Sequence, residues 1–221
     1  MESRIRKVME QTQVPLHLRQ TVCEEMLHGI AVSNLALLIG EEMGQPQDIC
    51  GKLEIAGVVH DIGKLRLTKY LYAEDGLMVE QVKYVRQHTA QSLEILQNTE
   101  IEEEIAQAVF HHHENYDGSG YPDNLRGGDI PLMARILRVC DVFIALITNR
   151  SYRKAFDAKT AMEIMIDEVK DYDMQVFLAF QRVIHRKNLM EHAEKIFQRA
   201  SSERQIETLS LFEQELQLLA E

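Results

Sequence analysis

The amino-acid sequence predicts an all-α fold, a helical bundle that ends in a C-terminal helical hairpin. Apolar residues recur at three- and four-residue spacing along most of the chain, and no segment shows the strict alternation of a half-buried strand. Only 4 prolines and 11 glycines interrupt the 221 residues, so long helices are expected. We expect them at 19–43, 47–62, 78–97, 101–114, 130–148, 158–169, 173–186, 189–200 and 203–220.

A few residues mark where these helices begin and end. Gly63 is well placed to end the second helix, and Asp129 with Pro131 is well placed to begin the fifth, because glycine ends helices and proline suits their first turn. Residues 115–129 read NYDGSGYPDNLRGGD, and the four glycines and one proline in this run predict a loop. Irregular loops of this length inside compact domains are usually functional.

The character of the chain changes near residue 186. We divide it into an N-terminal segment at 1–11, a main domain at 12–185 and an amphipathic tail at 186–221. The tail is expected to pack on the main domain, with a homodimer through the tail as the alternative; its apolar stripes are short for a coiled coil. No candidate chemical group lies in it, so it is expected to be dispensable for the chemistry. The stripes consist of Leu189, Ala193, Ile196 and Ala200, and of Leu209, Phe212, Leu216 and Leu219.

The composition limits the partners and the compartment. A net charge of −11 argues against a surface for a DNA or RNA polymer. Cys23, Cys50 and Cys140 are far apart and form no C-x-x-C, as expected of reduced thiols. The N-terminus lacks the apolar region of a signal peptide, and the most apolar stretch, Ile30 to Ile39, is too short to span a bilayer. We therefore expect a cytoplasmic protein without a membrane span.

Acids and histidines lie on or beside the apolar faces of five expected helices. Glu24 and His28 are four residues apart and share a face with apolar residues. His60 and Asp61 directly follow the apolar run of the second helix, and Asp141 borders the apolar stripe of the fifth. A lone buried carboxylate there would shift its pKa or cost several kcal/mol, so it requires a cation.

Three consecutive histidines end the expected helix at 101–114. On a helical wheel His112 falls at the centre of the apolar stripe. His111 and His113 lie on opposite flanks, each about 100° away, so the wheel alone does not choose between them. The stripe is formed by Ile101, Ile105, Ala108 and Val109.

The number of these residues points to metal binding. A single histidine on an apolar face is more often a satisfied core residue. Five imidazoles and three carboxylates together need compensation, which divalent metals supply. Eight nitrogen and oxygen ligands exceed the need of one ion, so two or three metals are implied. The absence of thiolates favours iron or manganese, with zinc as the alternative. The eight candidates are Glu24, His28, His60, Asp61, His88, His112, His113 and Asp141.

The same residues carry a family resemblance. His28, the HDIGK run at 60–64, His88, HHENYDGSGYP at 112–122 and Asp141 resemble the HD-GYP signature in order and approximate spacing. The resemblance covers roughly residues 12 to 182. It implies the helical bundle of the HD superfamily, in which a hydroxide bridging the metals attacks phosphorus and hydrolyses cyclic di-GMP to the linear dinucleotide pGpG, GMP or both.

The resemblance also implies a role for each matching residue. Asp61 would bridge two metal sites, and Glu24 would provide a third. Lys64, Arg150 and Arg153 would contact phosphate, Lys64 with a catalytic role beside Asp61. The first site would be completed by His28, His60 and Asp141, and the second by His88, His112 and His113. Gly120, Tyr121 and Pro122 would form the substrate-facing loop, where Tyr121 either stacks on guanine or anchors the loop.

The HD-GYP signature settles the question of the three histidines. Its paired histidines precede a glutamate, which here is Glu114, so the pair is His112 and His113. His111 is therefore expected to behave as a surface residue.

Three positions depart from the family pattern. Ile144 replaces the second acid of D-x-x-D-A-L, Asn149 replaces the aspartate before Arg150, and Ser92 replaces a glycine. These changes affect no expected metal ligand. The alternative functions are hydrolysis of cyclic GMP-AMP or a nucleotide, and a non-catalytic cyclic di-GMP receptor or adaptor. We call the loop at 115–129, which contains Gly120, Tyr121 and Pro122, the GYP loop. A signalling protein bound through the GYP loop is a further expected partner.

Overall fold

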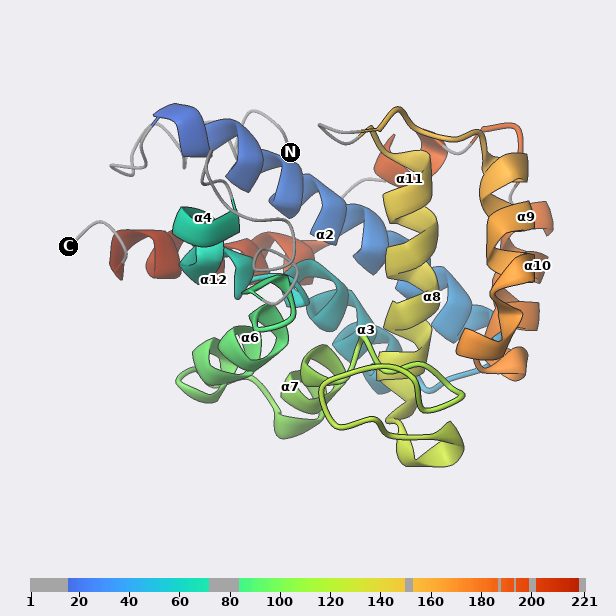
Figure 1. The fold of residues 1–221 in the computed structure, drawn as a ribbon, viewed down its shortest axis with the longest axis horizontal. Helices are drawn as coiled ribbons and strands as arrows, with labels where there is room; N and C mark the ends of the chain where they lie inside the picture. The colour runs from blue at the N-terminus through green and yellow to red at the C-terminus, as the bar shows by residue number, and fades with distance from the viewer. Residues whose placement is uncertain are drawn as a thin grey trace.

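The computed structural model describes residues 16–71, 84–149, 153–186, 188–192, 194–198 and 202–218. Within them every regular element is helical, which confirms the all-α prediction (Figure 1). Two short 3-10 turns cover Gly127–Asp129 and Val169–Asp171. The helices are α2 (Leu16–Glu42), α3 (Gln47–Val59), α4 (Lys64–Leu71), α6 (His88–Gln97), α7 (Glu103–Phe110), α8 (Leu132–Ile147), α9 (Ala158–Asp167), α10 (Met174–Arg186), α11 (Glu194–Gln198) and α12 (Glu203–Leu218).

Helices α2 and α3 pack closely because glycines lie where they cross. A Cβ atom at Gly29 would lie 2.4 Å from the carbonyl oxygen of Val58, and one at Gly57 would lie 2.4 Å from Cα of Ser33. Both distances are too short for real side chains, so only glycine permits this approach. The crossing brings His28, the neighbour of Gly29, close to the end of α3.

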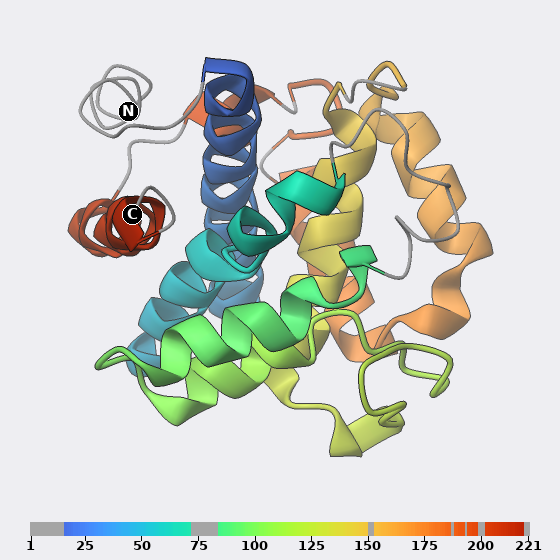
Figure 2. The ribbon, with the colours of Figure 1, turned by 60° about the vertical axis from the view of Figure 1, so that its left-hand side comes forward.

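The core extends from α2 and α3 to α8 and α10, with α6 and α7 adjacent to each other on another side (Figure 2). Its largest buried side chains come from several helices and include Met26, Leu35, Leu53, Phe143 and Phe180. Phe143 of α8 meets Phe180 of α10 edge to face, with ring centroids 5.0 Å apart.

Several helix ends differ from expectation, and the differences matter for the site. The second helix ends at Val59 rather than near residue 62, and helix α4 follows where none was expected. Gly63 lies in the intervening turn, where a Cβ atom would lie 2.2 Å from the carbonyl oxygen of His88. A glycine is needed at this position so that α6 can approach, and Gly63 does not end α3. The expected helix at 101–114 ends at Phe110, and α6 begins at His88; residues 78–83 lie outside the described residues.

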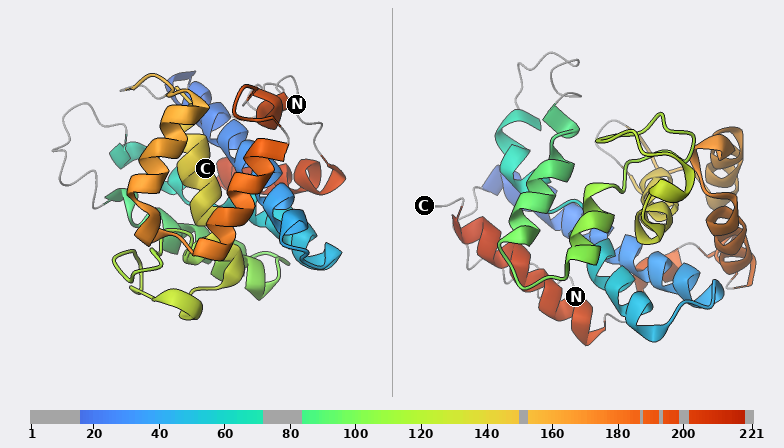
Figure 3. Two further views of the ribbon diagram at one scale, coloured as in Figure 1. Left: turned by 90° about the vertical axis from the view of Figure 1, so that its right-hand side faces the viewer. Right: turned by 90° about the horizontal axis from the view of Figure 1, so that it is seen from below.

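The C-terminal tail packs on the main domain. Helix α12 lies along α3, as the view from below shows (Figure 3). The Nε2 of Gln205 donates to Oγ of Ser33 at 2.7 Å and to Oδ1 of Asn34 at 2.9 Å. The described members of the two stripes are buried, namely Leu189, Ile196, Leu209, Phe212 and Leu216. Ala193, Ala200 and Leu219 lie outside the described side chains.

One helix segment, Val22–Glu42 of α2, is long and apolar enough to cross a membrane by length and composition. In the folded chain, 78% of its most apolar window is buried. A core helix satisfies the same criteria, and burial of this kind is what the packing of α2 against α3, α8 and α10 requires.

Candidate metal centre

The first group of candidate ligands joins three parts of the chain. His28 lies within α2, Asp141 lies within α8, and His60 with Asp61 occupies the turn after α3. One ligand atom from each residue lies within 4.8 Å of the others. The Nε2 of His28 is 2.9 Å from Oδ1 of Asp141, and that of His60 is 3.1 Å from Oδ2 of Asp61.

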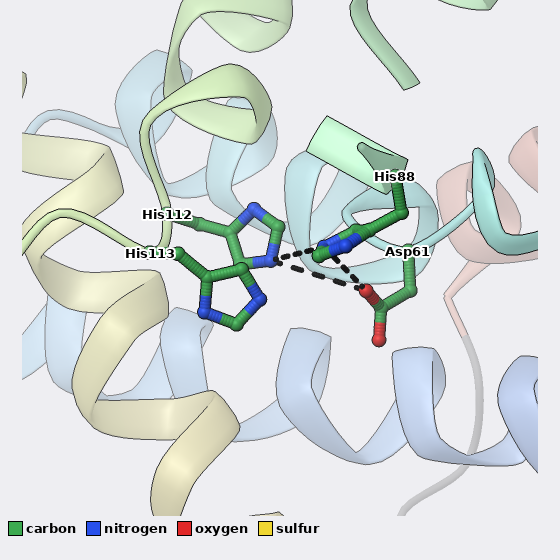
Figure 4. A group of neighbouring side chains, drawn as sticks. All are labelled: Asp61, His88, His112 and His113. Atoms are coloured by element: carbon green, nitrogen blue, oxygen red, sulfur yellow. Dashed lines mark hydrogen bonds and ion pairs between the residues drawn. The ribbon is translucent and has the colours of Figure 1, made fainter. Parts of the chain in front are cut away.

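A second group shares Asp61 with the first. It adds His88, His112 and His113, again with ligand atoms within 4.8 Å of one another (Figure 4). The Oδ1 of Asp61 lies 3.2 Å from Nε2 of His88 and 3.9 Å from Nε2 of His112. Asp61 therefore presents one carboxylate oxygen to each group, the geometry that a bridging ligand requires.

The second group is built at helix ends. His88 is the first residue of α6, while His112 and His113 lie beyond Phe110, the last residue of α7. The wheel used for His111 to His113 assumed a continuing helix, and that assumption was wrong. Instead, the amide of Glu114 donates to the carbonyl of His111 at 2.9 Å, and this turn aims the side chains.

Backbone carbonyls fix the orientation of three imidazoles. The Nδ1 of His60 is 2.9 Å from the carbonyl oxygen of Gly57, and that of His112 is 2.6 Å from that of Val109. The Nδ1 of His88 makes the same contact with the carbonyl oxygen of Val85. Because a carbonyl only accepts, Nδ1 carries a proton in each ring. In a neutral ring such as that of His88 or His112, Nε2 is then left with a lone pair on the side of the shared carboxylate. Metal-binding histidines are oriented in this way.

Both carboxylates remain ionised. Burial tends to raise the pKa of Asp61, but the charges of His60 and Lys64 outweigh it and hold the pKa well below its usual value. Asp141 is largely shielded from water, which tends to raise its pKa, but its hydrogen bond to His28 and the nearby charge of His60 keep that pKa well below the usual value. Two buried negative charges are therefore present at neutral pH.

Most of the imidazoles remain neutral. Burial lowers the pKa of His112 to about 3 and also lowers the pKa of His88 and His113. His60 differs: burial alone would lower its pKa, but the charges of Asp61 and Asp141 raise it to about 10. Neutral imidazole and ionised carboxylate are the forms that bind a metal, so His60 would have to release a proton.

The arrangement fits cations better than hydrogen bonds. The Nε2 atoms of His88 and His112 are 3.4 Å apart, although both carry lone pairs when Nδ1 donates to a carbonyl. The Oδ1 of Asp61 and the Nε2 of His60 are buried without a hydrogen-bond partner. Lone pairs that converge in a buried space repel one another unless a cation lies between them. The described residues therefore fit two divalent cations, held by the two groups.

The loop at 115–129 covers the second group. The ring of Tyr121 stacks on that of His113, with centroids 4.8 Å apart and 23° between planes. Gly120 permits this fold, because a Cβ atom there would lie 2.2 Å from the backbone nitrogen of Asn115. The peptide bond between Tyr121 and Pro122 is cis. The amide of Tyr121 donates to the carbonyl of His113 at 3.2 Å, so the loop is tied directly to a candidate ligand.

A protein-family model described as the HD domain matches residues 4–176. The chain belongs to the HD domain family. Its resemblance to the HD-GYP branch is confirmed, because relatives with matching segments are named cyclic di-GMP phosphodiesterases.

Two relatives differ in the substrate for which they are named. The chain is 30% identical over 160 residues to cyclic di-GMP phosphodiesterase PA4108 of Pseudomonas aeruginosa, which covers 72% of this chain and 39% of the relative. It is 34% identical over 153 residues to 3'3'-cGAMP-specific phosphodiesterase 1 of Vibrio cholerae, which covers 68% of this chain and 36% of the relative. The chain thus spans about two fifths or less of the length of these relatives.

Solved structures show the same fold. The HDG"Y"P protein Bd1817 of Bdellovibrio bacteriovorus matches with a TM-score of 0.61 at 19% identity, covering 83% of this chain and 61% of the other. A cyclic GMP-AMP-specific phosphodiesterase of V. cholerae, V-cGAP3, matches with a TM-score of 0.60 at 15% identity, covering 86% of this chain and 55% of the other. At these identities the likeness concerns the HD fold alone.

Glu24 is not a member of either ligand group of this HD domain. It is exposed and lies one helical turn before His28. Its neighbour Glu25 faces the site instead, with Oε2 at 3.2 Å from Nζ of Lys64. Sequence reasoning missed Glu25 because adjacent helical positions differ by about 100° in direction and only the spacing of Glu24 matched the family.

The predicted phosphate-contacting cations differ in their surroundings. The Nζ of Lys64 lies 2.6 Å from Oδ2 of Asp61, directly beside both ligand groups. Arg153 instead donates to the carbonyls of Ala145 and Leu146 at the end of α8, at 2.8 and 3.0 Å. Arg150 lies outside the described residues.

The three departures from the HD-GYP pattern have clear structural surroundings. Ser92 bridges the turn after α3, because its Oγ accepts from the amide of Gly63 at 2.9 Å and donates to the carbonyl of His60 at 3.1 Å. Ile144 is fully buried in the core. Asn149 accepts from the amide of Ala155 at 2.9 Å. None of the three occupies a position in either ligand group.

His111 is not a surface residue, and that expectation was wrong. Its side chain is buried, and only 7% of the residue is exposed. Its Nδ1 lies 3.0 Å from the carbonyl oxygen of Gln107, and its Nε2 lies 3.1 Å from Oδ2 of Asp123. It belongs to neither ligand group, and it anchors the GYP loop to the end of α7. The early end of α7 turns it into this position, which a continuous helical wheel does not predict.

Proposed function

We propose that this chain is a metal-dependent phosphodiesterase that hydrolyses cyclic di-GMP to pGpG, GMP or both. The observation that carries the proposal is the pair of ligand groups, mostly buried, that share Asp61 and offer only imidazole nitrogens and carboxylate oxygens. The names of the relatives support a cyclic dinucleotide as the substrate.

The residues of the chain would divide the work. His28, His60, Asp61 and Asp141 would hold one divalent cation, and Asp61, His88, His112 and His113 would hold a second. Such cations supply a nucleophile at neutral pH and neutralise charge on the phosphoryl oxygens. Lys64 adds a fixed positive charge beside Asp61, where it would stabilise negative charge that develops on the phosphate.

The donor set bears on the identity of the metal. All candidate ligands are imidazoles and carboxylates, which suits iron or manganese, with zinc as the alternative. Glu24, which belongs to neither of the two groups, would provide a ligand for a third cation. The proposal places the chain in the cytoplasm, where its three free thiols stay reduced.

A second substrate has specific support. Several relatives in V. cholerae are named 3'3'-cGAMP-specific phosphodiesterases, at 33–34% identity. Cyclic GMP-AMP has the same phosphodiester ring and differs at one base, so the metal centre alone would not separate the two. Base contacts would make the distinction.

The test combines metal analysis with hydrolysis. Protein purified without chelator, aerobically and anaerobically, is expected to carry at least two equivalents of iron or manganese and to cleave cyclic di-GMP. Parallel assays with 3'3'-cGAMP and bis(p-nitrophenyl) phosphate measure the preference. Less than one equivalent of metal in fresh, active protein would contradict the metal assignment. If protein reconstituted with iron or manganese cleaved 3'3'-cGAMP but not cyclic di-GMP, the assignment of cyclic di-GMP as the substrate would be overturned.

A further inference from the structure

Two arginines near the GYP loop differ from most others in their partners. Five arginines of the described chain pair with carboxylates, namely Arg66, Arg135, Arg182, Arg186 and Arg204. Arg86, Arg126, Arg138 and Arg153 pair with no carboxylate of the described residues, and of these Arg86 and Arg138 lie near the Tyr121 ring. In a protein of net charge −11, cations left without such a partner beside a candidate active site are suited to an anionic ligand.

Arg86 lies at the exposed edge of the metal centre. It is two residues before His88, and its guanidinium carbon lies 5.0 Å from the centroid of the Tyr121 ring. That ring stacks in turn on His113, which stands beside His112 in the second ligand group (Figure 4). Arg86 is therefore separated from a candidate metal ligand by one aromatic ring, and its side chain is open to solvent.

Arg138 approaches the same loop from α8. It lies on α8 three residues before Asp141, and positions three apart share a helix face. Its Nε donates to Oδ1 of Asn115 at 3.0 Å, and the backbone of Asn115 packs directly against Gly120, the residue before Tyr121. The positive charge of Arg138 also acts to lower the pKa of Tyr121, against the larger effect of burial, which agrees with its proximity to that ring.

The proposed substrate contains two phosphodiesters in one ring. The metal centre and Lys64 would take the phosphate that is cut, and Lys64 is already paired with Asp61 and Glu25. The other phosphate carries its own negative charge and needs a separate cation. Guanidinium groups suit this role because their planar donors match phosphate oxygens.

We propose that Arg86 and Arg138 form a second phosphate-binding position beside Tyr121, which holds the phosphodiester of a cyclic dinucleotide that is not being cut. This inference rests on the proposed function and deepens it, because it explains why a ring with two phosphates would be preferred over a single phosphodiester. The phosphate is common to cyclic di-GMP and cyclic GMP-AMP, so the position would favour both equally.

The experiment compares substrates that have one phosphate or two. Arg86→Met and Arg138→Met should each raise KM for cyclic di-GMP about tenfold, the loss expected for one charged hydrogen bond. For bis(p-nitrophenyl) phosphate the rise should be much smaller, so the ratio of kcat/KM between the two substrates should fall about tenfold. Calorimetry with a phosphorothioate analogue of cyclic di-GMP should show the same loss of affinity, and Arg86→Lys and Arg138→Lys should recover part of it.

Arg186→Met is the matched control. It removes one positive charge from the pair that Arg186 of α10 forms with Glu42 of α2, so it reports the effect of net charge alone and should leave the ratio unchanged. Metal content should equal that of the wild type in every variant. A similar loss with Arg186→Met, or an equal loss on both substrates, would overturn the inference.

The result also separates the inference from the proposed function. If the wild type cuts cyclic di-GMP while both arginine variants keep its KM, the inference fails and the function stands. If the wild type cuts bis(p-nitrophenyl) phosphate but binds and cuts no cyclic dinucleotide, both fail. A loss that is seen with cyclic di-GMP but not with 3'3'-cGAMP would assign the arginines to a base and overturn the phosphate position.

Discussion

The Nε of Arg66 lies 2.6 Å from Oε1 of Glu215, and this ion pair joins α4 to α12. Arg66 also lies 3.1 Å from Glu94 of α6, so one guanidinium connects three helices. Because α4 begins at Lys64, the C-terminal helix is connected to the element that presents this lysine to Asp61. The tail is thus part of the support of the site, although every candidate metal ligand precedes it.

Removing Glu215 should destabilise the protein. The side chain of Glu215 is 5% exposed and that of Arg66 is 24% exposed, so the pair is largely shielded from water. We expect Glu215→Ala to lower the free energy of unfolding by about 2–3 kcal/mol, because a cation would lose its main buried partner. Glu207→Ala, at an exposed position of the same helix, should change it by less than about 0.5 kcal/mol. Denaturant unfolding measures both, and equal effects would contradict this account.

The tail as a whole gives a related prediction. Truncation after residue 186 would remove Leu209, Phe212 and Leu216 from the core, and it would leave Ser33 and Asn34 without their contacts to Gln205. We expect lower solubility and a lower unfolding temperature. The chemistry itself is still predicted to need no residue of the tail. A soluble truncated protein with full metal content but no activity would contradict that prediction.

Gly63 should be intolerant of even a methyl group. A Cβ atom there would lie 2.2 Å from the carbonyl oxygen of His88 and 2.4 Å from the amide nitrogen of Ser92, and neither backbone atom yields easily. Gly63→Ala is therefore expected to displace α6, lower stability by several kcal/mol and reduce metal content. Gly128→Ala is the control, because nothing lies within 4 Å of its added Cβ. Thermal unfolding and elemental analysis separate the two, and wild-type metal content in Gly63→Ala would refute the close approach.

Lys64 and Arg153 should respond differently to substitution. Lys64→Ala is expected to retain metal while turnover falls on the order of 100-fold, the loss typical of one electrostatic donor. Arg153→Ala should instead lower stability by about 1–2 kcal/mol, because its guanidinium holds carbonyls at the end of α8. Steady-state kinetics and unfolding curves test this contrast. If Arg153→Ala lost turnover with unchanged stability, the phosphate role implied by the resemblance would be the better account.

The sequence predicted the fold class and the grouping of ligands, and it failed at helix ends. Spacing along α2 and α8 placed His28 and Asp141 on or beside apolar faces, since both lie inside regular helices, but their assignment to one ligand group came only from the family resemblance. Helical periodicity carries no information about a side chain beyond the last hydrogen-bonded turn, so His111 was misplaced once α7 ended at Phe110. The role of Ser92 depends on contacts with Gly63, 29 residues away along the chain, and no local pattern reveals such a pair.

The three adjacent histidines provide the sharpest test of the ligand assignment. His112→Ala and His113→Ala should each remove a ligand from the second group, lower metal content and abolish turnover. His111→Ala should keep its metal, but it is now expected to lower stability by about 1–2 kcal/mol, because a buried imidazole that holds Asp123 would be lost. Elemental analysis, kinetics and unfolding of all three variants distinguish these outcomes. If His111→Ala lost metal while His113→Ala kept it, the ligand pair would be His111 and His112, and the assignment would shift by one residue.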